Sequence, residues 1–158
     1  MALLYAKPVE YAIRALTYLA GKETDRSTSV IEIAEHENIS SHHLSKVMKA
    51  LARGKYVRAL RGPGGGYQLL VNPKEVTLWD IMGCLSAQEG FSECAIGWAE
   101  CSDENPCPLH TRWMAVRQNI ETYLKDCTIS DLALATEMKE GAGFNRGPLQ
   151  IRVPSAKD

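Results

Sequence analysis

The chain has 158 residues, of which 45% are hydrophobic and 23% charged, and its formal net charge is −1. These values are ordinary for a soluble globular domain, and the length is sufficient to bury a core. No apolar run approaches the roughly 20 residues of a membrane-spanning helix, and the start of the chain lacks the charged and apolar segments of a secretion signal. We therefore expect a cytoplasmic protein without a membrane partner.

The small net charge conceals an uneven distribution. Residues 1–75 contain 11 Lys and Arg against 7 Asp and Glu, whereas residues 76–158 contain 7 against 12. The stretch 42–61 has no acidic residue, and its basic residues are Lys46, Lys49, Arg53, Lys55, Arg58 and Arg61. A patch of one sign favours a polyanionic partner such as DNA. A charge run by itself, however, is more often a solvated helix face.

Three helices are predicted in the first third of the chain. Apolar residues recur at helical spacing over 7–20, where Pro8 suits a first helical turn, and a short helix follows over 30–35. Ser41 is then a suitable N-cap for a helix over 42–53. The buried stripe of this third helix is expected to be Leu44, Val47, Met48 and Leu51. A short helix, a turn and a helix with a basic outer face form a helix-turn-helix pattern, whose second helix enters the DNA major groove.

A two-stranded wing is expected directly after these helices. Residues 56–61 alternate like a strand, residues 62–66 (GPGGG) give a tight turn, and residues 67–71 form a second strand. Glycines allow backbone N–H groups to approach phosphates closely, and Arg58 and Arg61 add positive charge. The glycine run lacks the Lys-Ser/Thr ending of a nucleotide-binding P-loop.

The second half of the chain is predicted to contain a helix over 76–85, a loop over 86–108 and a long helix over 109–125. The apolar positions that repeat along the long helix are Leu109, Trp113, Val116, Ile120 and Leu124. A helix of this length beyond a finished domain is expected to pair with a second copy of the chain. The tail from residue 139 is rich in Gly, Pro and charge, and we expect it to be disordered.

Five cysteines require an explanation, because disulfides are rare in a reducing cytosol and an odd number cannot all be paired. Cys94, Cys101 and Cys107 lie close together in the loop, and His110 follows three positions after the last of them. Thiolates are the usual ligands of iron–sulfur clusters, and imidazole can replace one of them. Zinc bound by three cysteines and one histidine is the main alternative, although the spacing is looser than is usual for zinc. Uncoordinated thiols are a third possibility.

Two motifs resemble those of the IscR/NsrR-type iron–sulfur winged-helix transcriptional regulators, the Rrf-two family. They are RGPGGGY at 61–67 and CPLHTRW at 107–113, and the likeness covers residues 1–138. The resemblance implies an N-terminal winged helix, a dimerisation helix swapped against its mate, a [2Fe-2S] or [4Fe-4S] cluster on the cysteine loop, and a dimer that binds an operator. Six residues separate the first two cysteines here, whereas five are more usual in the family. This difference changes local geometry and leaves the number of ligands intact.

The resemblance also implies individual site residues. It offers His110 as a fourth cluster ligand, as in IscR-type members, and Glu10 as an acid that NsrR-like members present to the cluster of the opposite subunit. Histidine suits iron better and is adjacent to the cysteines, so His110 and a [2Fe-2S] cluster are favoured over Glu10 and a [4Fe-4S] cluster. The expected DNA contacts in the recognition helix and the wing are Ser40, Ser41, His42, His43, Ser45, Lys46, Lys49, Arg58, Arg61, Gly64 and Gly65.

The sequence therefore predicts a mainly α-helical protein with a small β wing. The expected parts are a winged helix-turn-helix domain (1–86), a cluster-binding loop (87–108), a dimerisation helix with a packing helix (109–138) and a tail (139–158). The predicted function is a homodimeric regulator that binds double-stranded DNA. An iron–sulfur cluster that responds to redox state, nitric oxide, or iron and cluster supply is expected to control this binding.

A zinc- or thiol-based regulator is the alternative. A small iron–sulfur electron carrier is less favoured, because it would not need the basic stretch and the wing. No cysteine has a His/Asp arrangement typical of a nucleophile, so no enzymatic activity is expected.

Overall fold

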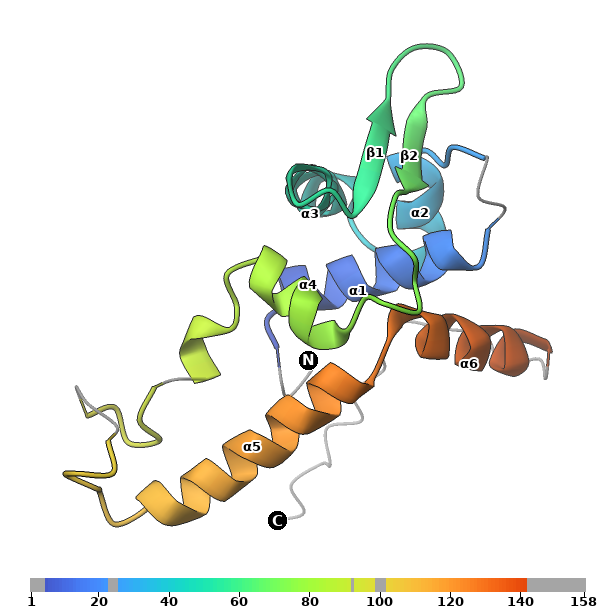
Figure 1. The fold of residues 1–158 in the computed structure, drawn as a ribbon. Helices are drawn as coiled ribbons and strands as arrows, with labels where there is room; N and C mark the ends of the chain where they lie inside the picture. The colour runs from blue at the N-terminus through green and yellow to red at the C-terminus, as the bar shows by residue number, and fades with distance from the viewer. Residues whose placement is uncertain (1–4, 23–25, 92, 99–101, 142–158) are drawn as a thin grey trace, which may run out of the picture.

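A computed structural model describes residues 5–22, 26–91, 93–98 and 102–141. These residues confirm the predicted fold class, because they form α-helices with one small antiparallel sheet (Figure 1). The elements in chain order are α1 (Lys7–Ala20), α2 (Val30–Glu37), α3 (Ser41–Arg53), β1 (Val57–Leu60), β2 (Gly66–Leu69), α4 (Leu78–Cys84), a 3-10 helix (Glu89–Phe91), α5 (His110–Asp126) and α6 (Ile129–Gly141). Within the described ranges, no helix has both the length and the apolar character needed to span a membrane.

Helix α1 is the central element of the core. It packs against α2, α3, α4, α6 and the sheet, with α2 and the sheet on one side and α6 on the other in Figure 1. Its most deeply buried apolar side chains are Val9, Ala12, Ile13, Ala15, Leu16 and Leu19. A helix that is apolar on most of its circumference must be enclosed by other elements, so the position of α1 determines where the surrounding helices can lie.

The helix-turn-helix pair α2 and α3 follows the predicted pattern with one correction. The Ser29 hydroxyl caps α2 by accepting from the Glu32 N–H at 3.1 Å, and the predicted stripe of α3 is buried. Ser41, however, is the first residue of α3 and not its N-cap. Ser40 occupies the cap position, where its carbonyl accepts the first helical hydrogen bond from the Leu44 N–H at 2.9 Å and its side chain makes no cap bond.

The wing consists of β1 and β2, which pair in antiparallel register from Val57 opposite Leu69 to Leu60 opposite Gly66. A third segment supports it, because Thr28 and Tyr67 exchange backbone hydrogen bonds of 3.0 and 2.8 Å. No local sequence pattern predicts this bridge, which connects the segment before α2 to the wing. Figure 1 shows the turn between the two strands projecting from the body of the protein.

The C-terminal helices are joined to the winged helix at one backbone junction. The Leu78 N–H donates to the Cys127 carbonyl at 3.0 Å, and the Ile129 N–H donates to the Val76 carbonyl at 2.9 Å. The start of α4 is therefore fixed to the connection between α5 and α6. The side chains of Leu124 and Ile129, on either side of that connection, are almost fully buried.

Helix α5 leaves this junction and extends away from the core (Figure 1). Leu124 is buried within the chain, whereas Leu109 and Val116 are 45% and 48% exposed, so the apolar stripe is covered only near the C-terminal end of the helix. The other large apolar side chains exposed on α5 are Met114 and Tyr123. Most of the helix therefore has no packing partner within the described part of one chain.

Two boundaries differ in detail from the expected ones. The predicted loop 86–108 contains the short 3-10 helix Glu89–Phe91, whose Phe91 ring packs edge-on against Trp79 with centroids 5.6 Å apart. Helix α6 continues to Gly141, so residues 139–141 are helical. The rest of the expected tail, from residue 142, lies outside the described residues.

The wing supplies a stability prediction. A Cβ added at Gly66 would collide with the Thr28 carbonyl group and lie 2.9 Å from the Ser29 nitrogen. Gly66→Ala is therefore expected to lower the free energy of unfolding by about 2 kcal/mol, because backbone must move to admit the methyl group. Urea unfolding at equilibrium measures the change. Gly90→Ala is the control: a Cβ there meets nothing within 4 Å, so a change below about 0.5 kcal/mol is expected. Equal destabilisation of the two variants would contradict this explanation.

Candidate DNA interface and cysteine loop

The outer face of α3 is exposed and basic. Ser40, His42, His43, Lys46 and Lys49 are all exposed, whereas the opposite face of the helix is buried in the core. The first turn of α3 contains no acidic residue, so no carboxylate of that turn weakens the positive end of the helix dipole. This face can accept phosphate groups or base edges.

Two side-chain contacts order the start of α3. The half-buried Ser45 donates its hydroxyl hydrogen bond to the Ser41 carbonyl at 2.7 Å. The rings of His42 and His43 meet edge to face with centroids 5.7 Å apart. The pair of imidazoles is thus held at the beginning of the helix, where a recognition helix meets DNA bases.

The predicted wing residues lie at the exposed tip or along the exposed edge of the sheet. Arg61 and Gly64 are exposed, and Gly65 is half-buried. A Cβ at Gly65 would lie 2.5 Å from the Leu60 carbonyl oxygen, so the turn requires glycine there. The Ser27 hydroxyl also donates to the Gly64 carbonyl at 2.6 Å, a contact that no sequence pattern predicts.

Arg58 is exposed but already has a protein partner. Its guanidinium donates to the Gln68 side-chain oxygen across the two strands at 2.7 Å. The interaction holds the side chain along the sheet and does not compensate its positive charge, because Gln68 is neutral. Arg58 therefore adds to the positive field of the wing even where it does not reach DNA itself.

The cysteine loop contains two buried thiols, and a buried imidazole follows it at the start of α5. Cys94 and Cys107 are 9% and 8% exposed, and His110, at the start of α5, is 5% exposed. Cys101 lies outside the described residues. Among the residues that are described, no group of three or more His, Cys, Asp or Glu side chains is arranged to hold a metal ion. The donor set itself, three thiols and one imidazole, is of the kind that binds iron–sulfur clusters.

The imidazole of His110 is oriented by a carboxylate. Its Nε2 atom lies 2.9 Å from Oδ1 of Asp103, a residue of the same loop. Metal-binding histidines characteristically use one ring nitrogen for the metal and the other for such a carboxylate or carbonyl. No sequence signal indicates Asp103, because six residues of irregular chain lie between it and His110.

The loop is fastened to α5 immediately before the first cysteine of the site. The carbonyl oxygen of Glu93 accepts hydrogen bonds from the Trp113 indole N–H at 3.2 Å and from the Arg117 guanidinium at 2.8 Å. Trp113 and Arg117 also lie side by side, with the guanidinium carbon 5.7 Å from the ring centroid. The backbone next to Cys94 is therefore held by two side chains of α5, whose helical spacing alone does not reveal this role.

Glu10, the other ligand considered, is engaged on α1. Lys7 and Arg14 lie 2.8 and 3.5 Å from its two carboxylate oxygens, and Arg14 also bonds Glu37 at 2.9 Å. Burial acts to raise the pKa of Glu10, but the hydrogen bonds and charges of Lys7 and Arg14 outweigh it and hold the pKa below its usual value. The carboxylate is thus ionised and committed to partners within its own chain.

Cys84 and Cys127 lie apart from the cysteine loop. Burial raises the pKa of the Cys84 thiol against the opposing charge of Arg53, and burial and the neighbouring Asp131 raise the pKa of Cys127. A raised pKa keeps a thiol protonated, and the protonated form is neither a metal ligand nor a nucleophile. Neither residue has the environment of a reactive cysteine.

Comparison with known proteins identifies relatives over most of the chain. Residues 5–135 match the family model Rrf2, described as "Iron-dependent Transcriptional regulator". The chain is 34% identical to a putative HTH-type transcriptional regulator of Aquifex aeolicus, over 82% of this chain and 91% of the relative. It is 50% identical to the putative HTH-type transcriptional regulator BadM of Rhodopseudomonas palustris (78% and 77%), and 26% identical to IscR of Vibrio atlanticus (82% and 75%).

Solved structures give the same result for the fold. CymR of B. subtilis, described as a global cysteine regulator, superimposes with a TM-score of 0.70 at 26% identity, over 85% of this chain and 98% of that chain. IscR of T. potens superimposes with a TM-score of 0.66 at 23% identity, over 89% and 92%. The likeness to IscR of T. potens is a likeness of fold.

The contact between the cysteine loop and α5 can be tested directly. Arg117→Gln removes the guanidinium that donates to Glu93, so the loop should open more easily. Since a hydrogen bond contributes about 0.5–1.5 kcal/mol net, amide hydrogen exchange of residues 93–98 should accelerate by about two- to tenfold. Mass spectrometry of the peptide that contains these residues measures the rate. Arg112→Gln, an exposed neighbour on the same helix, serves as the control and should leave exchange unchanged; similar acceleration in both variants would count against the anchor.

Proposed function

The chain belongs to the Rrf2 family of transcriptional regulators, and we propose that it acts as a homodimer whose operator affinity is controlled by an iron–sulfur cluster bound to the cysteine loop. The observation that carries the proposal is the position of that loop. It contains the buried thiols of Cys94 and Cys107, it leads into buried His110 at the start of α5, and it is fastened to α5 through Glu93. The site thereby lies between the winged helix and the helix proposed to form the dimer.

DNA binding is proposed to use α3 and the wing. The exposed face of α3 fits the major groove, which is about 12 Å wide and admits one helix. Lys46 and Lys49 supply charge along that face, and Arg61 supplies it at the wing. Backbone N–H groups near Gly64 and Gly65 can approach phosphates because no side chain intervenes. Base contacts are assigned to His42, His43 and Ser45 at the start of the helix.

The dimer is proposed to form along α5. Leu109, Val116 and Tyr123 follow one another at seven-residue spacing on one face of the helix and are 45%, 48% and 55% exposed, an apolar surface that a long solvated helix does not need. A second copy of the same helix would cover it and would place two recognition helices on one face. Operators of such dimers have half-sites about one helical turn or a multiple of it apart.

We assign the cluster ligands to Cys94, Cys101, Cys107 and His110, and we favour [2Fe-2S]. The contact between His110 and Asp103 supports this choice, since it resembles the outer contact of a metal-binding histidine. Glu10 is less suited, because binding a cluster across the dimer would cost it the ion pairs with Lys7 and Arg14. When bound, a cluster would supply an oxidation-sensitive link among these side chains.

The proposed control of DNA affinity depends on the loop that connects α4 to α5. Residues 87–108 connect α4 to α5, so the order of this loop determines how firmly α5 is held relative to the winged helix. A change in the direction of α5 would alter the separation of the two recognition helices in a dimer. Because half-site spacing on DNA is fixed, that change would weaken binding to the operator.

A thiol-based regulator without a metal is the second candidate. The likeness to CymR favours it, because that protein is described as a global cysteine regulator. In this case Cys94, Cys101 and Cys107 would respond as thiols. The raised pKa values of Cys84 and Cys127 make those two residues poor sensors.

DNA contacts are tested by substitution at the two proposed surfaces. Lys46→Ala and Arg61→Ala should each weaken operator binding, because each removes a cation that neutralises a phosphate. The slope of log affinity against log salt concentration should fall by about one for each phosphate that is no longer neutralised. Fluorescence anisotropy over a salt series measures both quantities. Lys125→Ala, on α5 and paired with Glu121, should change neither; binding by a monomer, or binding independent of salt, would contradict the proposal.

The cluster is tested by anaerobic purification with iron and sulfide counts. The protein should absorb visible light, and Cys94→Ala, Cys101→Ala or Cys107→Ala should abolish that absorbance. Cys84→Ala and Cys127→Ala are the matched controls and should retain it. His110→Ala should shift the spectrum and loosen the cluster, whereas Glu10→Ala should leave both nearly unchanged.

The same preparations decide whether the cluster controls DNA binding. Operator affinity of the holo and apo forms should differ by roughly 5- to 150-fold, the range of ordinary allosteric coupling. Equal affinities would leave the cluster without a regulatory role. A colourless protein with one zinc per chain would support a zinc site, and one with neither metal would support the thiol-based candidate. A reversed result for His110 and Glu10 would transfer the fourth ligand to the partner subunit.

A further inference from the structure

The tip of the wing is a glycine turn closed by one hydrogen bond of its own. The Gly65 N–H donates to the Gly62 carbonyl at 2.9 Å, and Gly64 between them has a φ of +73°. Proline at the second position and a positive φ at the third are the features of a type II turn. The hydrogen bond that closes the turn does not use the N–H of Gly64, which lies in the central peptide.

This turn has few restraints of its own. Glycine loses more backbone freedom on ordering than any other residue, and the turn from Gly62 to Gly65 contains three of them. A Cβ added at Gly62 or Gly64 would meet nothing within 4 Å, so the protein is not packed around these two residues. Order at the tip must therefore come from hydrogen bonds.

Ser27 supplies a restraint from outside the wing. Its hydroxyl donates to the Gly64 carbonyl at 2.6 Å, across 37 positions of the chain. The bond holds the same residue whose N–H is not used to close the turn. A side chain from the segment before α2 thus restrains the most exposed part of the wing.

The backbone next to Ser27 is itself fixed. Thr28 is fully buried, and it exchanges backbone hydrogen bonds of 3.0 and 2.8 Å with Tyr67 of β2. Ser29, the next residue, caps α2 by accepting from the Glu32 N–H at 3.1 Å. Ser27 is therefore attached directly to a segment that is held by both the sheet and α2, and its hydroxyl connects that segment to the tip.

We infer that Ser27 is a positioning residue for DNA binding: its hydroxyl orders the wing tip so that the Gly64 N–H is presented to a phosphate oxygen before DNA arrives. The inference rests on the proposed function, in which the wing contacts the operator. Backbone N–H groups are common phosphate donors. A tip that is ordered in advance binds more tightly than the same tip when mobile, because its conformational entropy is not lost on binding.

The first test uses the full chain without DNA. Order parameters from NMR relaxation should approach about 0.85, the value of rigid backbone, for the amides of Gly64 and Gly65, and should fall below about 0.6 in Ser27→Ala. Ser27→Thr keeps the hydroxyl and should retain the wild-type values. The amides of Thr28 and Tyr67 should stay rigid in both variants, since their bridge uses backbone atoms alone.

Ser130→Ala is the matched control for this measurement. Ser130 is a half-buried serine of α6, on the other side of α1 from the sheet (Figure 1). Its replacement should leave the order of the tip unchanged. A tip that remains rigid in Ser27→Ala, or that becomes equally mobile in Ser130→Ala, would overturn the inference.

The second test measures operator affinity by fluorescence anisotropy. Ser27→Ala should weaken binding by about two- to tenfold, the effect of one hydrogen bond on an equilibrium, and Ser27→Thr should restore it. Ser27→Ala removes no cation, so the slope of log affinity against log salt concentration should stay unchanged, whereas Arg61→Ala should lower it by about one. This difference separates the positioning of the tip from the neutralisation of a phosphate.

The two tests together distinguish this inference from the proposed function. A wild-type protein that binds no operator would refute the proposed function and the role of Ser27 in it, while the order parameters would still show whether Ser27 holds the tip. If the wild-type protein binds, and Ser27→Ala loses tip order without losing affinity, the positioning role alone is refuted. Loss of order and of affinity together, with an unchanged salt slope, would support it.

Discussion

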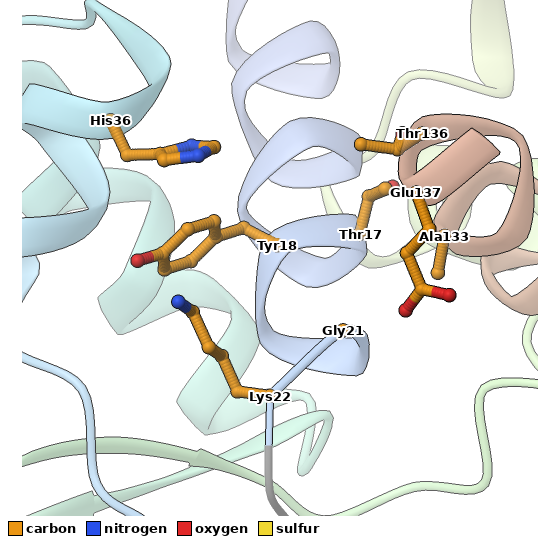
Figure 2. A pocket seen from close by; sticks show the side chains of 8 residues that line it. All are labelled: Thr17, Tyr18, Gly21, Lys22, His36, Ala133, Thr136 and Glu137. Atoms are coloured by element: carbon orange, nitrogen blue, oxygen red, sulfur yellow. The ribbon is translucent and has the colours of Figure 1, made fainter. Parts of the chain in front are cut away.

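The packing of α1 against four other helices and the sheet is the interaction on which this structure depends. Its apolar side chains face α2, α3, α4 and α6 at once, so no single neighbour can bury the helix. Two polar groups are buried with it: Glu10 is neutralised by Lys7 and Arg14, whereas the Thr17 hydroxyl has no partner among the described residues. The first arrangement stabilises the fold. The second lies beside the cavity that α1 forms with α2 and α6 (Figure 2).

Because α1 fixes both the recognition helix and α6, the DNA-binding body and α6 form one packed unit. Helix α5 is different, since it is held mainly at its two ends. Leu124 and the backbone bond from Leu78 to Cys127 hold one end, and the contacts of Trp113 and Arg117 with Glu93 connect the other to the cysteine loop. Between these contacts Ile120 packs partly against the core, whereas Met114 and Val116 are exposed. A helix supported in this way can change direction at low cost unless a second subunit or an ordered loop restrains it.

The sequence predicts the parts of this fold that depend on local periodicity. It misses the contacts between residues that no local pattern connects. The spacing of Leu44, Val47, Met48 and Leu51 identifies the buried face of α3, and the glycine run identifies the wing. The bridge between Thr28 and Tyr67 joins residues 39 positions apart, and no local pattern indicates it. The same holds for Asp103 beside His110, and for Glu137 beside Gly21. Val116, on the helix predicted to pair with a second copy, is 48% exposed in the single chain, and that pairing stays a prediction.

The candidate site shows the same contrast: the sequence indicates which residue types are present, and the structure shows what surrounds each of them. Cysteine spacing predicts a cluster site with zinc and uncoordinated thiols as alternatives, and the choice between His110 and Glu10 as fourth ligand requires their surroundings. Glu10 has the residue type of a possible ligand, and its two oxygens are already used by Lys7 and Arg14. His110 has one ring nitrogen on a carboxylate, and it lies at the first residue of α5, so a ligand bond there would act directly on the direction of that helix. A fourth ligand at this position can transmit the state of the loop to α5, whereas Glu10 could do so only across the dimer. In the proposed regulator, the fourth ligand would therefore be the first residue of the helix whose direction the cluster controls.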